Sequence, residues 1–208
     1  SDLAIDAGAA LGFALAVTLP RAGNIGGGGF MLVHVADLNK TIAIDFRETA
    51  PAAATQEMFF DSEGNVVLDE TYRFSHKSSA IPGSVAGLAH ILEKYGTMSL
   101  SEILQPAIRL ARDGIKVTYD LAADLDRSQR LRNNPASLKK FYKPDGSNYK
   151  VGELFKQPDL AWTLSEIAKD GVGAFYRGSV AEKIVADMEA HNGLITMEDL
   201  SNYEVLER

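Results

Sequence analysis

The apolar pattern of the chain opens with AGAALGFALAVTL at residues 7–19, a stretch rich in Ala and Gly. Small side chains let a helix pack closely against a neighbour, so we expect a buried helix over residues 3–18 that Pro20 ends. The stretch is shorter than the roughly 20 apolar residues that a membrane-spanning helix needs. We therefore predict a core helix and no membrane span.

A glycine-rich segment, residues 23–29, separates this helix from a stretch with the alternating pattern of a β-hairpin. Residues 30–36 are predicted to form one strand and residues 41–47 the other, joined by the turn sequence DLNK. Successive side chains of a strand point to opposite faces of the sheet. In the second strand one face carries Ile42, Ile44 and Phe46, and the other carries Thr41, Ala43, Asp45 and Arg47.

From about residue 80 the apolar residues recur at helical spacing. In residues 84–96 a stripe of apolar side chains predicts a helix that ends at Gly96; the stripe consists of Val85, Leu88, Leu92 and Tyr95. We expect further helices over residues 99–114, 119–131, 158–171 and 179–193, and a short turn over residues 196–203.

Local signals mark the ends of some of these helices. Ser99 with Glu102, and Ser179 with Glu182, have the spacing of capping boxes, in which each side chain bonds a free backbone N–H of the first turn. Pro106 lies inside a predicted helix and predicts a kink there, because proline has no N–H to donate.

The order of these elements indicates the fold class. Strands come early and helices come late, which favours an α+β architecture over the alternation of a doubly wound fold. We expect residues 1–208 to be a single, incomplete domain, with a hairpin core over about 23–60 and a helical part over about 80–208. A single hairpin is marginal in water, so this chain is expected to be a piece of a larger protein and to expose apolar surface.

Composition narrows the function classes. The net charge of −7 without basic runs argues against nucleic-acid binding. The absence of cysteine excludes disulfides, thiolate metal sites and a cysteine nucleophile. The four histidines, His34, His76, His90 and His191, have no mutual spacing typical of metal ligands. We therefore expect surface or hydrogen-bonded histidines, no metal and no cofactor.

The glycine run in AGNIGGGGFMLV, residues 22–33, is the first candidate for a site. It lacks the Lys-Ser/Thr of a phosphate-binding loop, and it precedes a strand, whereas a dinucleotide fingerprint follows one. Two interpretations remain open, close backbone packing and the wall of a ligand cavity. The sequence GSVAG at residues 83–87 places its serine one position too early for a nucleophile elbow, and Ser84 is interpreted as a helix N-cap.

The most informative stretch is DFRETAP, residues 45–51. Arg47 ends a predicted strand beside the glycine run, where its planar guanidinium could bind a carboxylate through two hydrogen bonds. The alternative is an ordinary salt bridge from Arg47 to Asp45 or Glu48. The residues alone leave both interpretations open.

Several blocks occur together and in order: AGNIGGGGFMLV, AIDFRETAP, SAIPGSVAGL, YGTMSLSEILQPAIRLARDGI, FYRGSVAEKIV and NGLITMEDLSNYEV. In this combination the chain resembles the bacterial γ-glutamyltransferases, also called γ-glutamyltranspeptidases or glutathione hydrolases. The likeness covers essentially the whole chain. It resembles the N-terminal part of the large subunit of that family.

The resemblance implies an N-terminal-nucleophile hydrolase with an αββα sandwich. In such proteins a precursor cleaves itself, and the new N-terminal threonine of the small subunit attacks the γ-glutamyl amide of glutathione. The acyl group then passes to water or to an amino acid or peptide. The resemblance further implies a periplasmic or secreted protein.

For individual residues, the resemblance implies that Arg47 binds the α-carboxylate of the γ-glutamyl group. No threonine of residues 1–208 is expected to be the nucleophile, and Thr49 belongs to the arginine motif, so the chain by itself is expected to be inactive. The expected partners are glutathione and the small subunit of the same precursor. The alternative hypothesis is a non-catalytic binding or scaffold domain of the same fold that recognises glutamate-like ligands.

Overall fold

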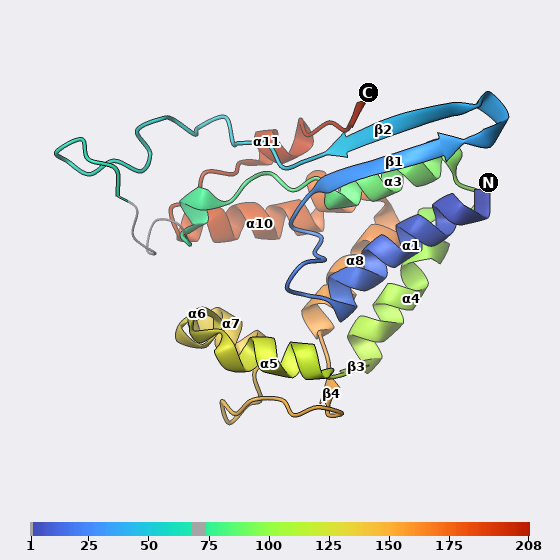
Figure 1. The fold of residues 1–208 in the computed structure, drawn as a ribbon. Coiled ribbons are helices and arrows are strands. Elements are labelled where there is room, and N and C mark those ends of the chain that lie inside the picture. Colours follow the sequence, from blue (N-terminus) through green and yellow to red (C-terminus); the bar gives the residue numbers. More distant parts are fainter. Residues whose placement is uncertain (1, 68–73) are drawn as a thin grey trace.

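The computed structural model describes residues 2–67 and 74–208, which form one sheet with helices against it and a second, smaller strand pair (Figure 1). The α-helices are α1 Asp2–Thr18, α3 Ser84–Tyr95, α4 Leu100–Asp113, α5 Tyr119–Arg127, α6 Gln129–Asn133, α7 Pro135–Phe141, α8 Pro158–Asp170, α9 Val172–Tyr176, α10 Ser179–Ala190 and α11 Met197–Ser201. The strands are β1 Gly29–Val35, β2 Lys40–Phe46, β3 Ile115–Lys116, β4 Leu154–Phe155 and β5 Leu206–Glu207. Short 3₁₀ helices lie at η1 Ala36–Leu38 and η2 His76–Ser78.

The predicted hairpin is confirmed, with each strand beginning one residue earlier than expected. Strands β1 and β2 are antiparallel, in a register that runs from Gly29 opposite Phe46 to Val35 opposite Lys40. The turn between them is η1 followed by Asn39, whose φ of 44° lies in the left-handed region that Asn tolerates. The sheet order is β1-β2-β5, because the end of the chain returns and pairs with the free side of β2.

The predicted division of β2 into two faces is also confirmed. Ile42, Ile44 and Phe46 are buried. Helix α3 packs against this side of the hairpin, and Figure 1 shows α1 and α3 on the same side of the sheet. The stripe predicted for α3 faces the same core, so the sheet and the first helices share one hydrophobic interior.

Helix α1 is confirmed in extent, but it is buried along one face only. Ala9, Phe13 and Val17 are fully buried, whereas Leu3 and Leu11 are exposed. The expectation of a buried helix was wrong in this respect, because α1 packs against α3 and α4 on one side and is apolar on both. Among the described residues, no helix is both long and apolar enough to cross a bilayer.

A buried carboxylate fixes α1 to the connection between α3 and α4. Asp6 accepts hydrogen bonds from the backbone N–H of Thr97 at 2.9 Å and of Met98 at 3.2 Å, and a further one from the Thr97 hydroxyl at 2.5 Å. These bonds lower the pKa of Asp6 below its ordinary value, and the bond from the Thr97 side chain has the largest effect. The charge is therefore retained in the core because its oxygens are bonded.

The capping box predicted at Ser99 and Glu102 is confirmed at the start of α4, which contains Pro106 and continues to Asp113. The box predicted at Ser179 and Glu182 is wrong. Ser179 is the first residue of α10, and its hydroxyl donates to Glu166 of α8 at 2.7 Å. The serine thus connects two helices, and so is unavailable to cap its own.

The helix expected over residues 119–131 is instead two helices, α5 and α6, which meet at Ser128. The hydroxyl of Tyr142 donates to the carbonyl oxygens of Leu125 and Ser128, which stabilises this break. The Asn-Pro pair that follows starts α7. Asn134 accepts from the N–H of Ser137 at 2.9 Å, and proline suits the first helical position because its missing N–H is not needed there.

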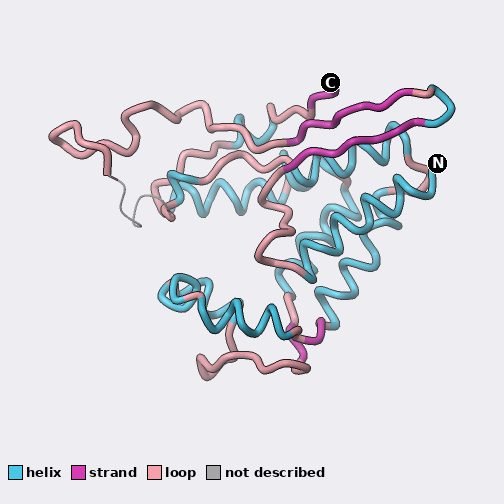
Figure 2. The backbone as a smooth tube through the Cα atoms, in the orientation of Figure 1, coloured by secondary structure: helices cyan, strands magenta, loops and turns pink. Residues whose placement is uncertain are grey.

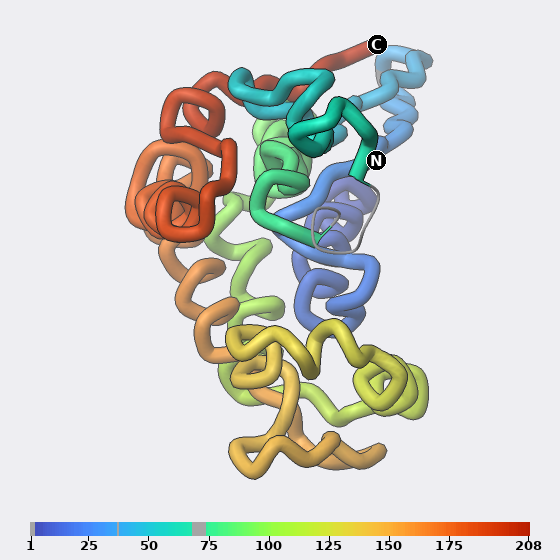
Figure 3. The backbone as a smooth tube through the Cα atoms, turned by 90° about the vertical axis from the view of Figure 1, so that its left-hand side faces the viewer, coloured from blue at the N-terminus to red at the C-terminus, as the bar shows by residue number. Residues whose placement is uncertain are grey.

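The helical part extends away from the sheet. Helices α4 and α8 pack side by side, and α5–α7 lie at the end of this pair that is remote from the sheet (Figures 1 and 3). Beyond β2 the chain continues as a long stretch of loop and turn that projects past the sheet (Figure 2). The strand pair β3–β4, which was not predicted, joins the start of α5 to the start of α8.

The face of the sheet turned away from the helices exposes large apolar side chains. Phe30 and Leu32 of β1 are 69% and 75% exposed, and Leu206 of β5 is also exposed. Strand β1 is an edge strand of the described sheet. An apolar face next to an open edge favours association with another surface.

We expect the isolated 208-residue chain to self-associate through this face. Replacing Leu32 with Glu should reduce the association, because the charge would have to be buried in the contact. Sedimentation velocity of the chain and the variant measures this. Val151→Glu, which changes another exposed apolar side chain in a turn elsewhere, is the matched control. A chain that stays monomeric at all concentrations would contradict the prediction.

Candidate functional site

The candidate site lies where β2 ends. Arg47 follows the last residue of β2, and its side chain is 62% exposed. The central carbon of its guanidinium lies 5.8 Å from the centre of the Phe30 ring, which is close enough for a cation–π contact. The guanidinium therefore lies beside the exposed face of the sheet, while Phe46, one residue earlier, points into the core.

The glycine run packs directly against this strand end. A Cβ atom on Gly28 would overlap the carbonyl oxygen of Phe46 and lie 2.8 Å from the backbone nitrogen of Glu48. The carbonyl oxygen of Gly27 accepts two hydrogen bonds, from Gly83 at 2.8 Å and from Ser84 at 2.9 Å. The interpretation of close backbone packing is thus confirmed, because no side chain fits at Gly28.

The start of α3 approaches the same strand end equally closely. A Cβ on Gly83 would overlap the Phe46 carbonyl oxygen, and a Cβ on Gly87 would overlap the Phe46 side chain. The expectation that Ser84 caps α3 was wrong. Ser84 is the first helical residue and is buried, and the N-cap position belongs to Gly83 because a larger residue would not fit there.

Two tyrosines that sequence reasoning missed hold the Arg47 peptide from the other side. The Tyr203 hydroxyl donates to the carbonyl oxygen of Arg47 at 2.9 Å. Its ring stacks on that of Tyr176 with centres 5.7 Å apart, and the Tyr176 hydroxyl donates to the Pro82 carbonyl oxygen at 2.8 Å. Tyr203 lies 156 residues after Arg47, so no local signal in the sequence could connect them.

The pKa of Tyr203 reflects this position. Burial of the phenol raises it to about 12, and the neighbouring carboxylates of Asp45 and Glu48 act in the same direction. The hydroxyl therefore keeps its proton and remains a donor to Arg47 at neutral pH.

The segment after Arg47 is pinned by backbone bonds. Thr49 and Ile81 exchange two hydrogen bonds, at 2.8 and 3.3 Å. Asp199 accepts from the N–H of Ala52 at 2.8 Å and also forms a capping box with Thr196 at the start of α11. Burial alone would raise the pKa of Asp199, but the bonds from Ala52 and Thr196 outweigh it and lower the pKa. The turn predicted over residues 196–203 thus fixes the Arg47 loop.

Of the two salt bridges considered for Arg47, the structure contains the one to Glu48, whereas the Asp45 side chain pairs with Arg208. The Asp45 carboxylate pairs with Arg208 at 3.1 Å and accepts only the backbone N–H of Arg47. The Nε of Arg47 lies 3.4 Å from Oε2 of Glu48, which is its ion-pair partner within the described part of the chain. Because the arginine of this pair is mostly exposed and the contact is long, the pair contributes about 0–1 kcal/mol and holds the guanidinium weakly.

A pocket of about 360 Å³ lies next to this strand end. It is lined by α1, by Gly27 and Gly28 of the glycine run, by Ser84 and by Glu48. The glycine run is thus also a pocket wall, and the second interpretation, in which this pocket holds a ligand, stays a prediction. A larger groove of about 1090 Å³ lies between α7 and α8 and contains none of these residues.

The histidines have polar partners, as expected. His34 lies 3.1 Å from the Thr41 hydroxyl, and His90 lies 2.7 Å from the Glu207 carboxylate. His76 and His191 come together around Asp187. The comparison of histidine spacings could not find this cluster, since its third member is a carboxylate and His76 is remote in sequence.

Known proteins share both the sequence and the fold of this chain. The sequence model of the Gamma-glutamyltranspeptidase family matches residues 3–208. The chain is 48% identical over 207 residues to the glutathione hydrolase proenzyme of Escherichia coli strain K12, covering 99% of the chain and 35% of that protein. It thus spans about a third of the length of such relatives.

Solved structures agree in fold. The crystal structure of Helicobacter pylori gamma-glutamyltranspeptidase superposes with a TM-score of 0.94 at 45% identity, covering 99% of this chain and 58% of that one. The gamma-glutamyltranspeptidase of Pseudomonas nitroreducens, solved in complex with L-DON, gives a TM-score of 0.89 at 40% identity, covering 99% of this chain and 59% of that one.

The α+β fold is therefore that of the N-terminal-nucleophile hydrolases. Within that class, the chain belongs to the gamma-glutamyltranspeptidase family.

We expect Gly87→Ala to destabilise the protein. Overpacking against Phe46 costs about 1–3 kcal/mol, and the better helix propensity of Ala offsets at most about 1 kcal/mol of this. The Tm should fall by a few degrees, at roughly 2–4 °C per kcal/mol. Gly8→Ala in α1 is the control, because its Cβ would meet no atom within 4 Å. Equal melting temperatures for the two variants would refute the packing argument.

Tyr203→Phe should lower the free energy of unfolding by about 1 kcal/mol at neutral pH through the lost hydrogen bond to Arg47. The deficit should shrink as the pH rises above about 10, because the folded wild type keeps a proton that the unfolded chain releases and so loses stability towards pH 12. Urea unfolding of the wild type and the variant across this pH range measures the difference between their free energies of unfolding. The contributions of other titrating groups cancel in that difference. A deficit that grows with pH would contradict this account.

Proposed function

We propose that the chain is the γ-glutamyl-recognising part of a γ-glutamyltransferase. The whole protein would cleave the γ-glutamyl amide of glutathione and transfer the γ-glutamyl group to water or to an amino acid or peptide. Support comes from the family membership and from relatives that are named glutathione hydrolase proenzymes. The word proenzyme also supports a precursor that is cleaved into two subunits. The nucleophile in this proposal is the N-terminal threonine of the small subunit, outside residues 1–208.

The observation that carries the proposal is the setting of Arg47. Its backbone is held by Gly28, Tyr203 and the Thr49–Ile81 bonds, while its guanidinium remains 62% exposed. A γ-glutamyl donor carries a free α-carboxylate at the end remote from the scissile amide. A planar guanidinium donates two parallel hydrogen bonds to such a carboxylate, which fixes direction as well as charge.

In this mechanism Arg47 sets the position of the reacting bond. With the α-carboxylate held, the γ-carbonyl carbon is restricted to a small region, and attack by the nucleophile becomes effectively intramolecular. Glu48 contacts the guanidinium at 3.4 Å, and this pair is weak enough for a ligand carboxylate to compete with it.

The exposed sheet face has a role in the same proposal. In an αββα sandwich two sheets pack face to face, and their inner faces are apolar. Phe30, Leu32 and Leu206 form such a face. We assign its partner as the sheet of the small subunit, which would bring the nucleophile close to Arg47. By resemblance to the bacterial relatives, the protein would act in the periplasm or outside the cell.

Arg47→Ala in the full-length protein should lower kcat/KM for a chromogenic γ-glutamyl amide by about 10²-fold or more, since charge-assisted hydrogen bonds contribute roughly 1.5–3 kcal/mol each. Arg47→Lys should recover only part of the loss, because an ammonium keeps the charge without the planar fork. Initial rates on the parent donor and on an analogue without the α-carboxylate measure the effect.

The analogue should be a poor substrate of the wild type and should lose little more in Arg47→Ala. Glu48→Gln is the matched control, because it breaks the ion pair and leaves the guanidinium in place. If Arg47 served only that ion pair, both variants would lose stability and would penalise the two donors equally. Equal losses of kcat/KM on the two donors would favour the alternative, in which Arg47 has only a structural role.

A further inference from the structure

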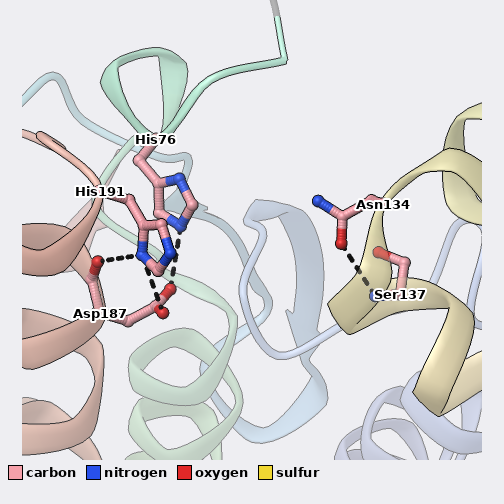
Figure 4. A network of polar contacts seen from close by, with 5 residues as sticks. All are labelled: His76, Asn134, Ser137, Asp187 and His191. Atoms are coloured by element: carbon pink, nitrogen blue, oxygen red, sulfur yellow. Dashed lines mark hydrogen bonds and ion pairs between the residues drawn. The ribbon is translucent and has the colours of Figure 1, made fainter.

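A cluster of possible metal ligands lies where η2 meets the end of α10, in a part of the molecule that the proposed function does not use. Asp187 lies in the last turn of α10, and His191, four residues later, is the residue at which the helix ends, so the two side chains lie next to each other. His76 comes from η2 and lies over them (Figure 4). Potential ligand atoms of the three residues all lie within 4.8 Å of one another.

The three side chains already share contacts. Nε2 of His76 lies 3.0 Å from one carboxylate oxygen of Asp187, and Nδ1 of His191 lies 3.3 Å from the other. The two imidazole rings are stacked, with centres 4.4 Å apart and planes inclined by 10°. Both imidazoles are thus gathered around a single carboxylate (Figure 4).

We propose that His76, Asp187 and His191 bind a divalent transition-metal ion of the zinc type. Two imidazole nitrogens and one carboxylate oxygen are a frequent ligand set for Zn²⁺, with water as the fourth ligand. One carboxylate and two neutral imidazoles also suit a dication better than a monovalent ion. Mg²⁺ and Ca²⁺ prefer oxygen ligands throughout, so the nitrogens select against them.

The surroundings of His191 favour this role. Its Nδ1 lies 2.8 Å from the backbone carbonyl oxygen of Asp187, and donation of that N–H leaves the lone pair of Nε2 free for a metal. His191 is also the residue that follows the last turn of α10. The C-terminal end of a helix carries partial negative charge, which stabilises a nearby cation.

The backbone brings η2 close to α10 in advance of any ligand. Asn192 has a φ of 57°, in the left-handed region, and the N–H of Gly193 then bonds the carbonyl oxygen of Met188 at 2.7 Å. A Cβ on Gly193 would lie 3.1 Å from the Cβ of His76 and would overlap the Met188 sulfur. Glycine at this position therefore allows His76 to approach α10. Asp187 and His191 are exposed, so ions can reach the cluster from solvent.

The test uses the full-length protein, free of any affinity tag and stripped with a chelator. Zn²⁺ is titrated calorimetrically, and Co²⁺ is used as a spectroscopic probe of a tetrahedral site. The variants are His76→Gln, Asp187→Asn and His191→Ala, and the control is His34→Ala, which removes a histidine that contacts Thr41 on the hairpin. Asp187→Asn keeps the shape of the side chain, so it reports on ligation even if another variant folds poorly.

We expect each cluster variant to lose one equivalent of Zn²⁺ per chain, or to bind that equivalent at least about tenfold more weakly. His34→Ala should retain it, and excess Mg²⁺ should not displace it. Amide hydrogen exchange in residues 76–79 and 187–193 should slow on addition of Zn²⁺ to the wild type. Identical Zn²⁺ binding by the wild type and all three variants would overturn the proposal, as would displacement by Mg²⁺ at comparable concentrations.

Discussion

The arrangement around Arg47 depends on how closely the backbone can approach the segment from Phe46 to Glu48. At Gly28, Gly83 and Gly87 a single added carbon would overlap or crowd this segment. Because these positions lack a Cβ, both the glycine run and the start of α3 pack directly against the strand end. The strand end is therefore fixed by main-chain contacts, which vary less than contacts through long side chains.

A fixed backbone under an exposed side chain is a useful combination for recognition. The Arg47 guanidinium is 62% exposed, whereas the backbone from which it extends is set by bonds to its own carbonyl oxygen and to the next residues. Only the last few torsions remain to be ordered when a carboxylate arrives, so the entropic cost of binding is small. The neighbouring charges support this, since Asp45 is occupied by Arg208 and does not compete for the guanidinium.

Sequence patterns predicted the parts of the fold that rest on local physics. The hairpin faces, the extents of α1, α3 and α4 and the Ser99 capping box follow from periodicity and nearby hydrogen-bond partners. The errors arose where a distant residue took over. Ser179 bonds Glu166 of α8 in place of its own helix, and Tyr142 stabilises a break at Ser128 that composition does not show. At the candidate site, Arg47 stood out as a charge at a strand end, whereas Tyr203 and β5 arrive from the other end of the chain.

The distance along the chain between Arg47 and Tyr203 has a consequence for the order of folding during synthesis. The contacts of the glycine run with α3 join residues 27 and 83, so they can form once the first half of the chain has emerged from the ribosome. The bond from Tyr203 spans 156 residues, and β5 pairs with β2 across a similar interval. Contacts of such long range form slowly, and the emerging chain folds from its N-terminal side. During that interval both edges of the hairpin are open, and this is the stage at which a chaperone would be of most use.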